Sequence, residues 1–289
     1  MKFAVIEVNR GSHVALVVDD EVIDLAEQLQ LGEGGLPHFL SLGDAIFRAA
    51  ESLAKSACPR RFISDVVFRS PVEGADKIVG VGMNYHSFVA AARNLGLPIP
   101  ADRIWFYRPR SCIAGPSDPI WLPRNAADLD YEGELAIVIG RPCRYVSAAD
   151  ASGVIAGFTI ANDLTLRDRV RRSLVLAKSF DSHTPIGPWV VTPDEIGDPH
   201  RLGLRTWVNG ELRQDSTTAD MIGSCYELIV ELSATCTLNP GDVVLTGTPD
   251  GCGLFSPAGH APRRRCSSRR NRSDRHHRKS RGLRAEGPR

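Results

Sequence analysis

Acidic side chains stand at every second position of one short segment: Asp128, Asp130, Glu132 and Glu134. Alternate side chains of a β-strand point to the same face, so a strand here gathers negative charges on one face. One such pair ~7 Å apart costs roughly 2 kcal/mol at an effective dielectric constant of ~20. The apolar residues 135–139 that follow indicate that the strand continues into a core. We therefore expect something positive to lie among these carboxylates.

The rest of the pattern predicts a β-rich α+β protein. Further short strands are expected at residues 3–8, 14–18, 22–24, 65–70, 77–82, 157–162, 188–191, 204–208 and 242–246, and helices at 38–57, 85–95 and 219–234. These strands do not alternate with helices as a doubly wound sheet requires. A linker at residues 71–74 (PVEG) predicts a small N-terminal domain of residues 1–72, followed by a larger domain of residues 73–259.

Charge is distributed unevenly along the chain. Residues 260–289 hold 12 of the 35 Lys and Arg residues and 2 of the 34 Asp and Glu residues, which leaves residues 1–259 with 23 basic and 32 acidic groups and a net charge of −9. An acidic body without clustered basic and aromatic residues is not expected to bind nucleic acid. By composition alone, the basic tail is typical of a disordered interaction segment.

The cysteines and the apolar runs bear on the compartment. The seven cysteines form no CxxC pair, so neither a disulfide framework nor a zinc site is predicted. The N-terminus lacks the features of a signal peptide, and no apolar run reaches membrane-spanning length. We expect a soluble cytoplasmic protein with no membrane partner.

Three of the acidic residues suit a metal ion. Glu132 and Glu134 share a strand face, and Asp163 follows the apolar strand at 157–162. Carboxylate oxygens are ligands for hard divalent cations, and Mg²⁺ or Mn²⁺ fits best. A solvated acidic strand edge explains the alternation itself equally well.

The order of motifs between residue 77 and about residue 256 resembles the fumarylacetoacetate hydrolase family. The matching segments are GVGMNY (80–85), GPSDPIWLP (115–123), DLDYEGELAIVIG (128–140), GFTIANDLTLRD (157–168), LAKSFD (176–181), GPWVVTPDEIGDP (187–199), VNGELRQDS (208–216), DMI (220–222) and LNPGDVVLTGTPDGCG (238–253). The resemblance implies a mixed β-roll, a homodimer and a divalent cation held by Glu132, Glu134 and Asp163. It also implies a substrate that is a small 2-oxo or 1,3-dicarbonyl acid, such as an acylpyruvate or a related product of aromatic ring cleavage.

The resemblance also suggests roles for individual side chains. Lys178 matches a lysine beside the metal, where it would stabilise negative charge or carry a proton. Thr248 and Tyr85 fall among the substrate-binding residues. Arg108 and Arg110 lie where the family often has a lysine, and are either a bidentate clamp for a second carboxylate or simple surface charges.

One part of the family pattern is missing. Hydrolytic and decarboxylating members commonly carry a His and a Glu that activate water, and these positions fall on Phe88 and Ala91. His86 lies two residues earlier, on a different helix face, so it is a catalytic candidate only if this segment is a rearranged loop. Three functions therefore stay open: hydrolysis of a C–C bond in an acylpyruvate-type acid, isomerisation or decarboxylation of a 2-hydroxymuconate-type diacid, and metal binding without catalysis.

The tail departs from the family as well. The family continues after the glycine-rich loop with another strand pair, whereas residues 260–289 contain no aromatic residue, Ile or Val. For the segment from His260 to Ser280, codons can be chosen that encode these residues and that, when read in a frame shifted by one base, encode a sequence like the missing ending. We therefore interpret the tail as a disordered product of a frameshift near Gly259, in preference to an RNA-binding tail.

Overall fold

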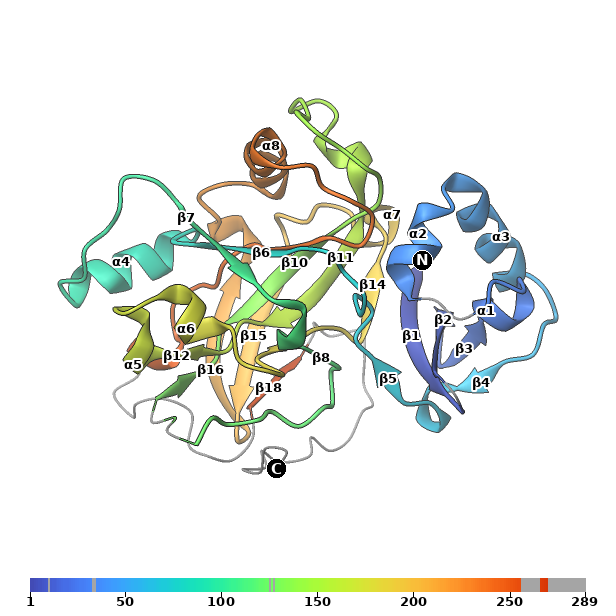
Figure 1. The fold of residues 1–289 in the computed structure, drawn as a ribbon, viewed down its shortest axis with the longest axis horizontal. Coiled ribbons are helices and arrows are strands. Elements are labelled where there is room, and N and C mark those ends of the chain that lie inside the picture. The colour runs from blue at the N-terminus through green and yellow to red at the C-terminus, as the bar shows by residue number, and fades with distance from the viewer. Residues whose placement is uncertain (10, 33–34, 125, 127, 256–265, 270–289) are drawn as a thin grey trace.

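The computed structural model describes residues 1–9, 11–32, 35–124, 126, 128–255 and 266–269. Within this part of the chain, one mixed sheet of eleven strands crosses the molecule (Figure 1). In spatial order its strands are β4 (Arg61–Phe62), β3 (Glu21–Asp24), β2 (Gly11–Val18), β1 (Lys2–Val8), β14 (Trp189–Val191), β11 (Ile155–Asn162), β10 (Gly133–Ile139), β17 (Val243–Leu245), β6 (Ile78–Gly82) and β7 (Ile104–Arg108), with β5 (Phe68–Arg69) also paired to β1. Only β17 and β6 pair in parallel among them.

The N-terminal part is the predicted meander of β1, β2 and β3, covered by α1 (Leu25–Gln28), α2 (Leu36–Ser41) and α3 (Asp44–Ala54). Residues 38–41 and 44–54 are helical, as predicted for residues 38–57, but they form two helices, because Gly43, with φ 75°, follows the first and caps the start of the second. β1 pairs directly with β14, so the N-terminal strands extend the central sheet. The division of the chain at residue 72 stays a prediction.

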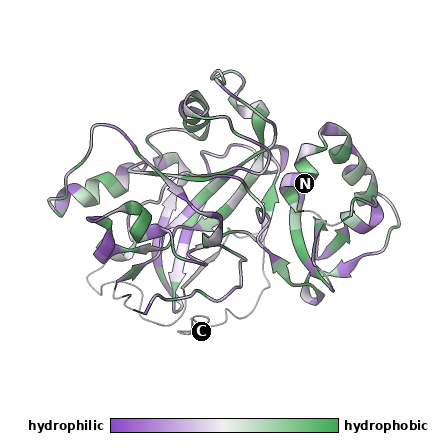
Figure 2. Cartoon of the chain, viewed as in Figure 1, coloured by the Kyte–Doolittle hydropathy of each residue, from purple (hydrophilic) through white to green (hydrophobic). Residues whose placement is uncertain are grey.

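The centre of the sheet is β10, which is buried along its whole length between β11 and β17. A strand that is buried on both faces has a continuous apolar sequence. Figure 2 shows mainly hydrophobic residues along these strands. The predicted strand from residue 128 is interrupted at Tyr131 and Glu132. The two residues before the break form β9 (Leu129–Asp130), which pairs with β12 (Thr165–Leu166) instead of with the main sheet.

Smaller elements surround this sheet. The strands are the parallel pair β8 (Ile113–Ala114) and β13 (Thr184–Pro185) and the antiparallel pair β15 (Gly203–Val208) and β16 (Glu211–Thr217). The helices are α4 (His86–Asn94), α5 (Arg167–Val170), α6 (Leu174–Lys178), α7 (Pro193–Ile196) and α8 (Cys225–Thr235). Short 3₁₀ turns lie at 63–65, 110–112, 151–154, 218–220 and 253–255. The predicted strand-rich α+β class is confirmed. No helix within the described part of the chain is long and apolar enough to cross a bilayer.

The tail is described only in part. Residues 260–265 and 270–289, on which the prediction of a disordered segment mostly falls, lie outside the described residues. Cys266–Arg269 form strand β18, which pairs antiparallel with β15, so the prediction was wrong for these four residues. An open sheet edge offers backbone donors and acceptors to any extended segment, whatever its side chains.

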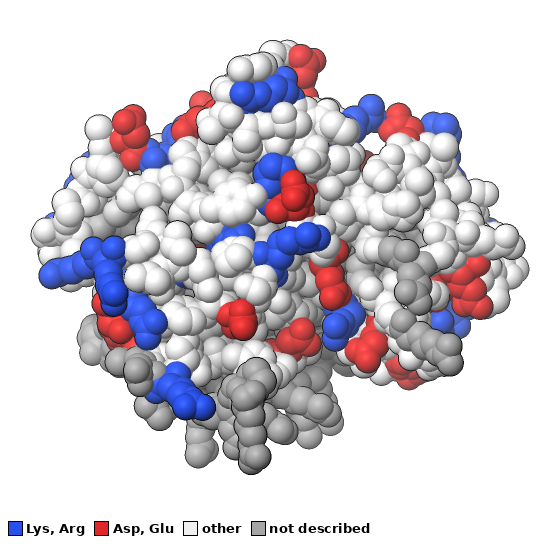
Figure 3. Space-filling view, viewed as in Figure 1, with Lys and Arg blue, Asp and Glu red and all other residues white. Residues whose placement is uncertain are grey.

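Charges of both signs are mixed on the molecular surface. On the face shown in Figure 3, Lys and Arg side chains are interspersed with Asp and Glu side chains. A nucleic-acid backbone is bound by concentrated positive charge. The expectation that residues 1–259 do not bind nucleic acid stays a prediction.

Candidate metal centre and substrate pocket

Three buried carboxylates meet where β10 begins and β11 ends. In the antiparallel pair, Gly133 lies opposite Asn162, so Glu132 and Glu134 on one strand come beside Asp163 after the other. One ligand oxygen from each carboxylate lies within 4.8 Å of those of the other two. A set of three carboxylate oxygens fits a hard divalent cation such as Mg²⁺ or Mn²⁺. The structure thus brings together the three residues that the sequence singled out as metal ligands.

Gly133, between the two glutamates, has no room for a side chain. A Cβ there would lie 2.3 Å from Thr206 Oγ1. Its N–H donates to Gln214 Oε1 (3.0 Å), and its carbonyl accepts from Thr248 Oγ1 (2.9 Å). The close packing of β15 and β16 against this glycine therefore fixes the strand that carries Glu132 and Glu134.

Lys178, the last residue of α6, supplies one of the positive charges that the carboxylates require. Its Nζ donates to Glu132 Oε2 (2.7 Å), to Thr165 Oγ1 (2.8 Å) and to the Asp163 carboxylate. It also lies 4.7 Å from the centroid of the Phe106 ring. Burial lowers the pKa of Lys178, while attraction to Glu132 opposes that change. The lysine thus stands at the metal ligands, as the family resemblance implied.

Arg167, at the start of α5, supplies a second positive charge that sequence reasoning did not single out. Its guanidinium donates to Asp130 Oδ2 (2.7 Å) through Nε and to Glu132 through Nη2. Asp130 also accepts from the backbone N–H groups of Gly253 and Leu254. Asp130 therefore anchors Arg167 against Glu132, and does not itself join the three-carboxylate group. The repulsion among alternating carboxylates was a signal that such a cation was needed, but not of its position.

The two candidate substrate-binding arginines lie in different surroundings. Arg108 is fully buried behind Asp163, where its Nη1 contacts the carboxylate and its Nη2 donates to the carbonyl oxygens of His183 (3.0 Å), Leu164 (3.4 Å) and Lys178. Arg110 is exposed and donates to the carbonyl oxygen of Gly74 (3.0 Å). Arg108 therefore contacts the carboxylate of Asp163, whereas Arg110 makes its hydrogen bond away from the three carboxylates.

A pocket of about 120 Å³ opens onto the carboxylates, with room for several water molecules or a small acid. Its walls are Val81, Gly82, Met83, Phe88, Ile104, Phe106, Glu132, Glu134, Asp163, Arg167, Val170, Leu174, Lys178, Gly247 and Thr248. Thr248 is one of these lining residues, and its role in substrate binding stays a prediction. Among the described residues, no histidine lines this pocket.

Of the other residues named in the sequence analysis, Phe88 lines the pocket, whereas Tyr85, His86 and Ala91 do not. Tyr85 is completely buried, and His86 is exposed at the first turn of α4. Phe88 fills the position of the family histidine and packs edge-on against Phe255, with ring centroids 4.9 Å apart. Ala91 is half-buried on the same helix. The α4 wall of the pocket is therefore apolar.

The two glutamates differ in their electrostatic surroundings. Burial would raise the pKa of Glu132, but Lys178 and Arg167 outweigh it and hold that pKa at about 2. Burial, followed by the charge of Glu132, raises the pKa of Glu134 to about 8. Glu134 accepts a hydrogen bond from the N–H of Gly247 (2.8 Å). Glu134 therefore holds its proton near neutral pH, and a divalent cation bound beside it would displace that proton.

Known proteins match this chain in sequence and in fold. The model of the fumarylacetoacetate (FAA) hydrolase C-terminal family matches residues 77–278. A mitochondrial oxaloacetate tautomerase of Bos taurus is 42% identical over 221 residues, which are 75% of this chain and 69% of the relative.

Solved structures extend the likeness to most of the chain. The maleylpyruvate hydrolase of Sphingobium sp. SYK-6, in complex with manganese(II) and pyruvate, is similar with a TM-score of 0.74 and 32% identity, over 88% of this chain and 90% of that one. The 5-carboxymethyl-2-hydroxymuconate delta-isomerase of Mycobacterium smegmatis gives a TM-score of 0.70 and 34% identity, over 88% and 90% of the two chains.

Proposed function

The chain belongs to the fumarylacetoacetate hydrolase family, and we propose that it is a divalent-metal enzyme that interconverts tautomers or double-bond isomers of a small enolisable 2-oxo acid. The observation that carries this proposal is the pairing of a buried lysine with three carboxylates in a pocket whose α4 wall is apolar. Such a site has the groups needed for enolate chemistry, and in the described part of the chain no histidine that would activate water lines it.

Glu132, Glu134 and Asp163 are the residues that would hold the ion, which we propose to be Mg²⁺ or Mn²⁺. When bound, such an ion acts as a Lewis acid toward the oxo and carboxylate oxygens of a 2-oxo acid. Thr248 faces the same pocket, and its hydroxyl is held by the Gln214 amide (2.8 Å) and directed at the Gly133 carbonyl. We assign Thr248 to orientation of the substrate carboxylate.

Lys178 is the proposed proton carrier. In its neutral form the amine accepts a proton from C3 of the substrate, the C–H electron pair becomes the C2–C3 double bond, and the C2–O π pair moves to oxygen to give the enolate. The ammonium then returns the proton to oxygen or to another carbon. Burial favours the neutral amine, and the contacts with Glu132 and Asp163 hold Nζ at the pocket floor.

The presence of Phe88 at the position of the family histidine is the reason why we favour enolisation over hydrolysis. Loss of a general base costs roughly 10²–10⁴-fold in rate, and Phe88 offers no proton acceptor where the family places a histidine. Hydrolysis of an acylpyruvate-type C–C bond is the second candidate, which the likeness to maleylpyruvate hydrolase favours. Decarboxylation would use the same enolate chemistry, and a metal-binding protein without catalysis is the outcome if no reaction occurs.

Exchange of the C3 protons separates these functions. In deuterated buffer with Mg²⁺, we expect the protein to catalyse deuterium exchange at C3 of 2-oxobutanoate and acetylpyruvate, followed by proton NMR, without cleaving acetylpyruvate. Cleavage faster than exchange would favour the hydrolase. If neither reaction occurs with Mg²⁺, and no turnover is seen by absorbance with Mn²⁺, the non-catalytic relative would be favoured.

The family resemblance also leads us to propose a homodimer, a cytoplasmic location and a role in aromatic compound catabolism. Light scattering of the purified protein tests the first. Parallel calorimetric titrations with Mg²⁺ and Mn²⁺ identify the tighter-binding ion.

A further inference from the structure

The metal pocket has a polar floor and apolar walls. Beside the carboxylates and Lys178, much of its lining comes from apolar side chains on α4, β7, α5 and α6. These side chains are Phe88, Ile104, Phe106, Val170 and Leu174, together with Met83, which follows the end of β6. Burial of a substrate's carbon chain against such walls is favourable, and each CH₂ group removed from water tightens binding about fourfold.

A second carboxylate on the substrate would find no free cation in this pocket. Among the described residues that line it, the positively charged side chains are Arg167 and Lys178, and each already donates to Glu132. Arg167 is held by Asp130 as well (2.7 Å). A distal carboxylate would therefore lose its hydration against apolar side chains without gaining an ion pair, which is costly. The pocket thus suits an acid whose single carboxylate lies at the metal ligands.

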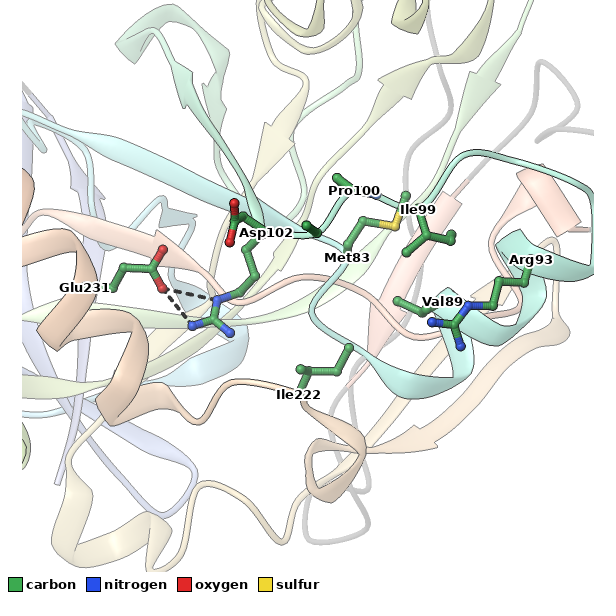
Figure 4. Close-up of a pocket in the computed structure, with 10 residues that line it drawn as sticks. Met83, Val89, Arg93, Ile99, Pro100, Asp102, Ile222 and Glu231 are labelled. Carbon is green, nitrogen blue, oxygen red and sulfur yellow. Dashed lines mark hydrogen bonds and ion pairs between the residues drawn. The ribbon is translucent and has the colours of Figure 1, made fainter.

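Met83 lies between the metal pocket and a second pocket. It lines both, and in the second pocket, of about 430 Å³, its side chain points toward Ile99 (Figure 4). Met83 has φ 63°, a left-handed conformation that is uncommon outside glycine and is often found at functional sites. The neighbouring Asn84 holds this turn, because its buried side chain donates to the carbonyl oxygens of Thr246 (2.9 Å) and Gly223 (3.1 Å). A carbon chain that extends from the metal pocket toward the second pocket therefore meets a methionine on a fixed backbone.

We propose that the metal pocket takes a 2-oxo acid with a hydrocarbon side chain and no second carboxylate, and that Met83 sets the longest side chain that fits. This rests on the proposed function, because the reacting end of the acid is placed at the metal centre. It disfavours 2-hydroxymuconate-type diacids and makes Met83 a specificity-determining residue. A methionine side chain is unbranched and adaptable, so it packs against carbon chains of different shape while still limiting their length.

The first test measures how binding to the wild type depends on chain length. Binding of saturated 2-oxo acids, from 2-oxobutanoate to 2-oxodecanoate, to the Mg²⁺-loaded protein is measured by calorimetry, and C3 deuterium exchange by NMR. We expect the affinity to rise about fourfold per CH₂ group and to fall once the chain reaches Met83. 2-Oxoglutarate and 2-oxopentanoate have the same number of carbons, and we expect the diacid to bind at least about tenfold more weakly because its second carboxylate stays unpaired.

The second test changes the limit on chain length. Met83→Ala truncates the side chain at Cβ, so the optimal acid should become about two or three carbons longer. Alanine disfavours a φ of 63° as methionine does, so this change does not relieve the backbone turn that Asn84 holds. Met83→Leu keeps most of the side-chain volume and should keep the wild-type optimum. Leu42→Ala shortens an exposed leucine between α2 and α3 and serves as the control outside the pocket.

The two proposals fail in different ways. Equal or tighter binding of 2-oxoglutarate, no gain in affinity with chain length, or no binding of any of these acids overturns the hydrocarbon assignment. An affinity that still rises at 2-oxodecanoate in the wild type, or the same optimum in Met83→Ala, overturns the role of Met83. The expected chain-length dependence without C3 exchange of any acid upholds the inference and refutes the proposed chemistry.

Discussion

Replacing Glu132 or Glu134 by glutamine is expected to change the stability of the metal-free protein in opposite directions, although both changes remove a proposed metal ligand. For Glu134, burial and the charge of Glu132 raise the pKa from its ordinary value of 4.5 to about 8. The folded protein therefore keeps this proton while the unfolded chain loses it above pH 4.5, so stability falls as the pH rises from 4.5 to 8. The loss at pH 7 is about 3 kcal/mol, and Glu134→Gln should restore up to that amount.

Glu132 behaves in the opposite sense. Its pKa of about 2, below the ordinary 4.5, reflects Lys178 and Arg167, whose attraction exceeds the effect of burial. An acidic group whose pKa is lowered by folding stabilises the folded state, and this stabilisation is fully present above pH 4.5 and is lost as the pH falls toward 2. For Glu132 it amounts to about 3 kcal/mol of unfolding free energy. Glu132→Gln should therefore destabilise the protein at pH 7 by about 3–5 kcal/mol, because it leaves two buried cations short of a partner.

The assay is urea unfolding of chelator-treated wild type and both variants at pH 7, followed by circular dichroism, with Mg²⁺ affinity measured separately by calorimetry. We expect the unfolding midpoint of Glu134→Gln at or above that of the wild type, a clearly lower midpoint for Glu132→Gln, and no measurable Mg²⁺ binding by Glu134→Gln. Shifts of both midpoints in the same direction would refute the electrostatic reasoning. Unchanged Mg²⁺ affinity of Glu134→Gln would refute the metal assignment.

Lys178→Met is expected to lower turnover at least about a hundredfold, the range for a general acid or base, with a much smaller change in calorimetric Mg²⁺ affinity; activity within a few-fold of the wild type would make the lysine structural. His86→Ala should keep most activity because His86 is exposed outside the pocket wall, and a loss above about a hundredfold in the same assay would show that it acts as a base. Burial lowers the pKa of His183 from 6.5 to about 4. Between these two pH values the unfolded chain therefore binds a proton on this side chain that the folded protein does not bind. Between pH 7 and pH 5 the wild type should then lose about 2 kcal/mol more unfolding free energy than His183→Gln, measured with urea; parallel pH dependences of the two proteins would contradict this.

The sequence predicted the features that depend on local periodicity. The alternation of Glu132 and Glu134 and the place of Asp163 after an apolar strand left two interpretations open, and the order of the family motifs favoured the one in which the three carboxylates lie together, as they do. The first three strands formed where the apolar pattern indicated. The break at Tyr131 was not anticipated, because it depends on groups far along the chain that hold Asp130 away from the main sheet, such as the Gly253 N–H.

The positions of the arginines could not be predicted for a related reason. Arg167 reaches Glu132 from 35 residues away, and only the folded structure determines which of several arginines does so. Arg108 and Arg110 have similar sequence surroundings, yet the first ends β7 inside the core and the second begins an exposed turn. Pairings between distant segments are set by tertiary packing, which composition and spacing do not record.

The pairing of β1 with β14 has a practical consequence for any attempt to isolate the larger part of the chain. Lys2, Phe3 and Ala4 lie opposite Val191, Val190 and Trp189, so removal of residues 1–72 would take away the neighbour of β14. The freed strand would present unpaired backbone groups and the apolar side chains of Trp189 and Val191. A truncated protein beginning at residue 73 should therefore be found mainly in aggregates when it is expressed, even though the carboxylates and Lys178 are all retained in it.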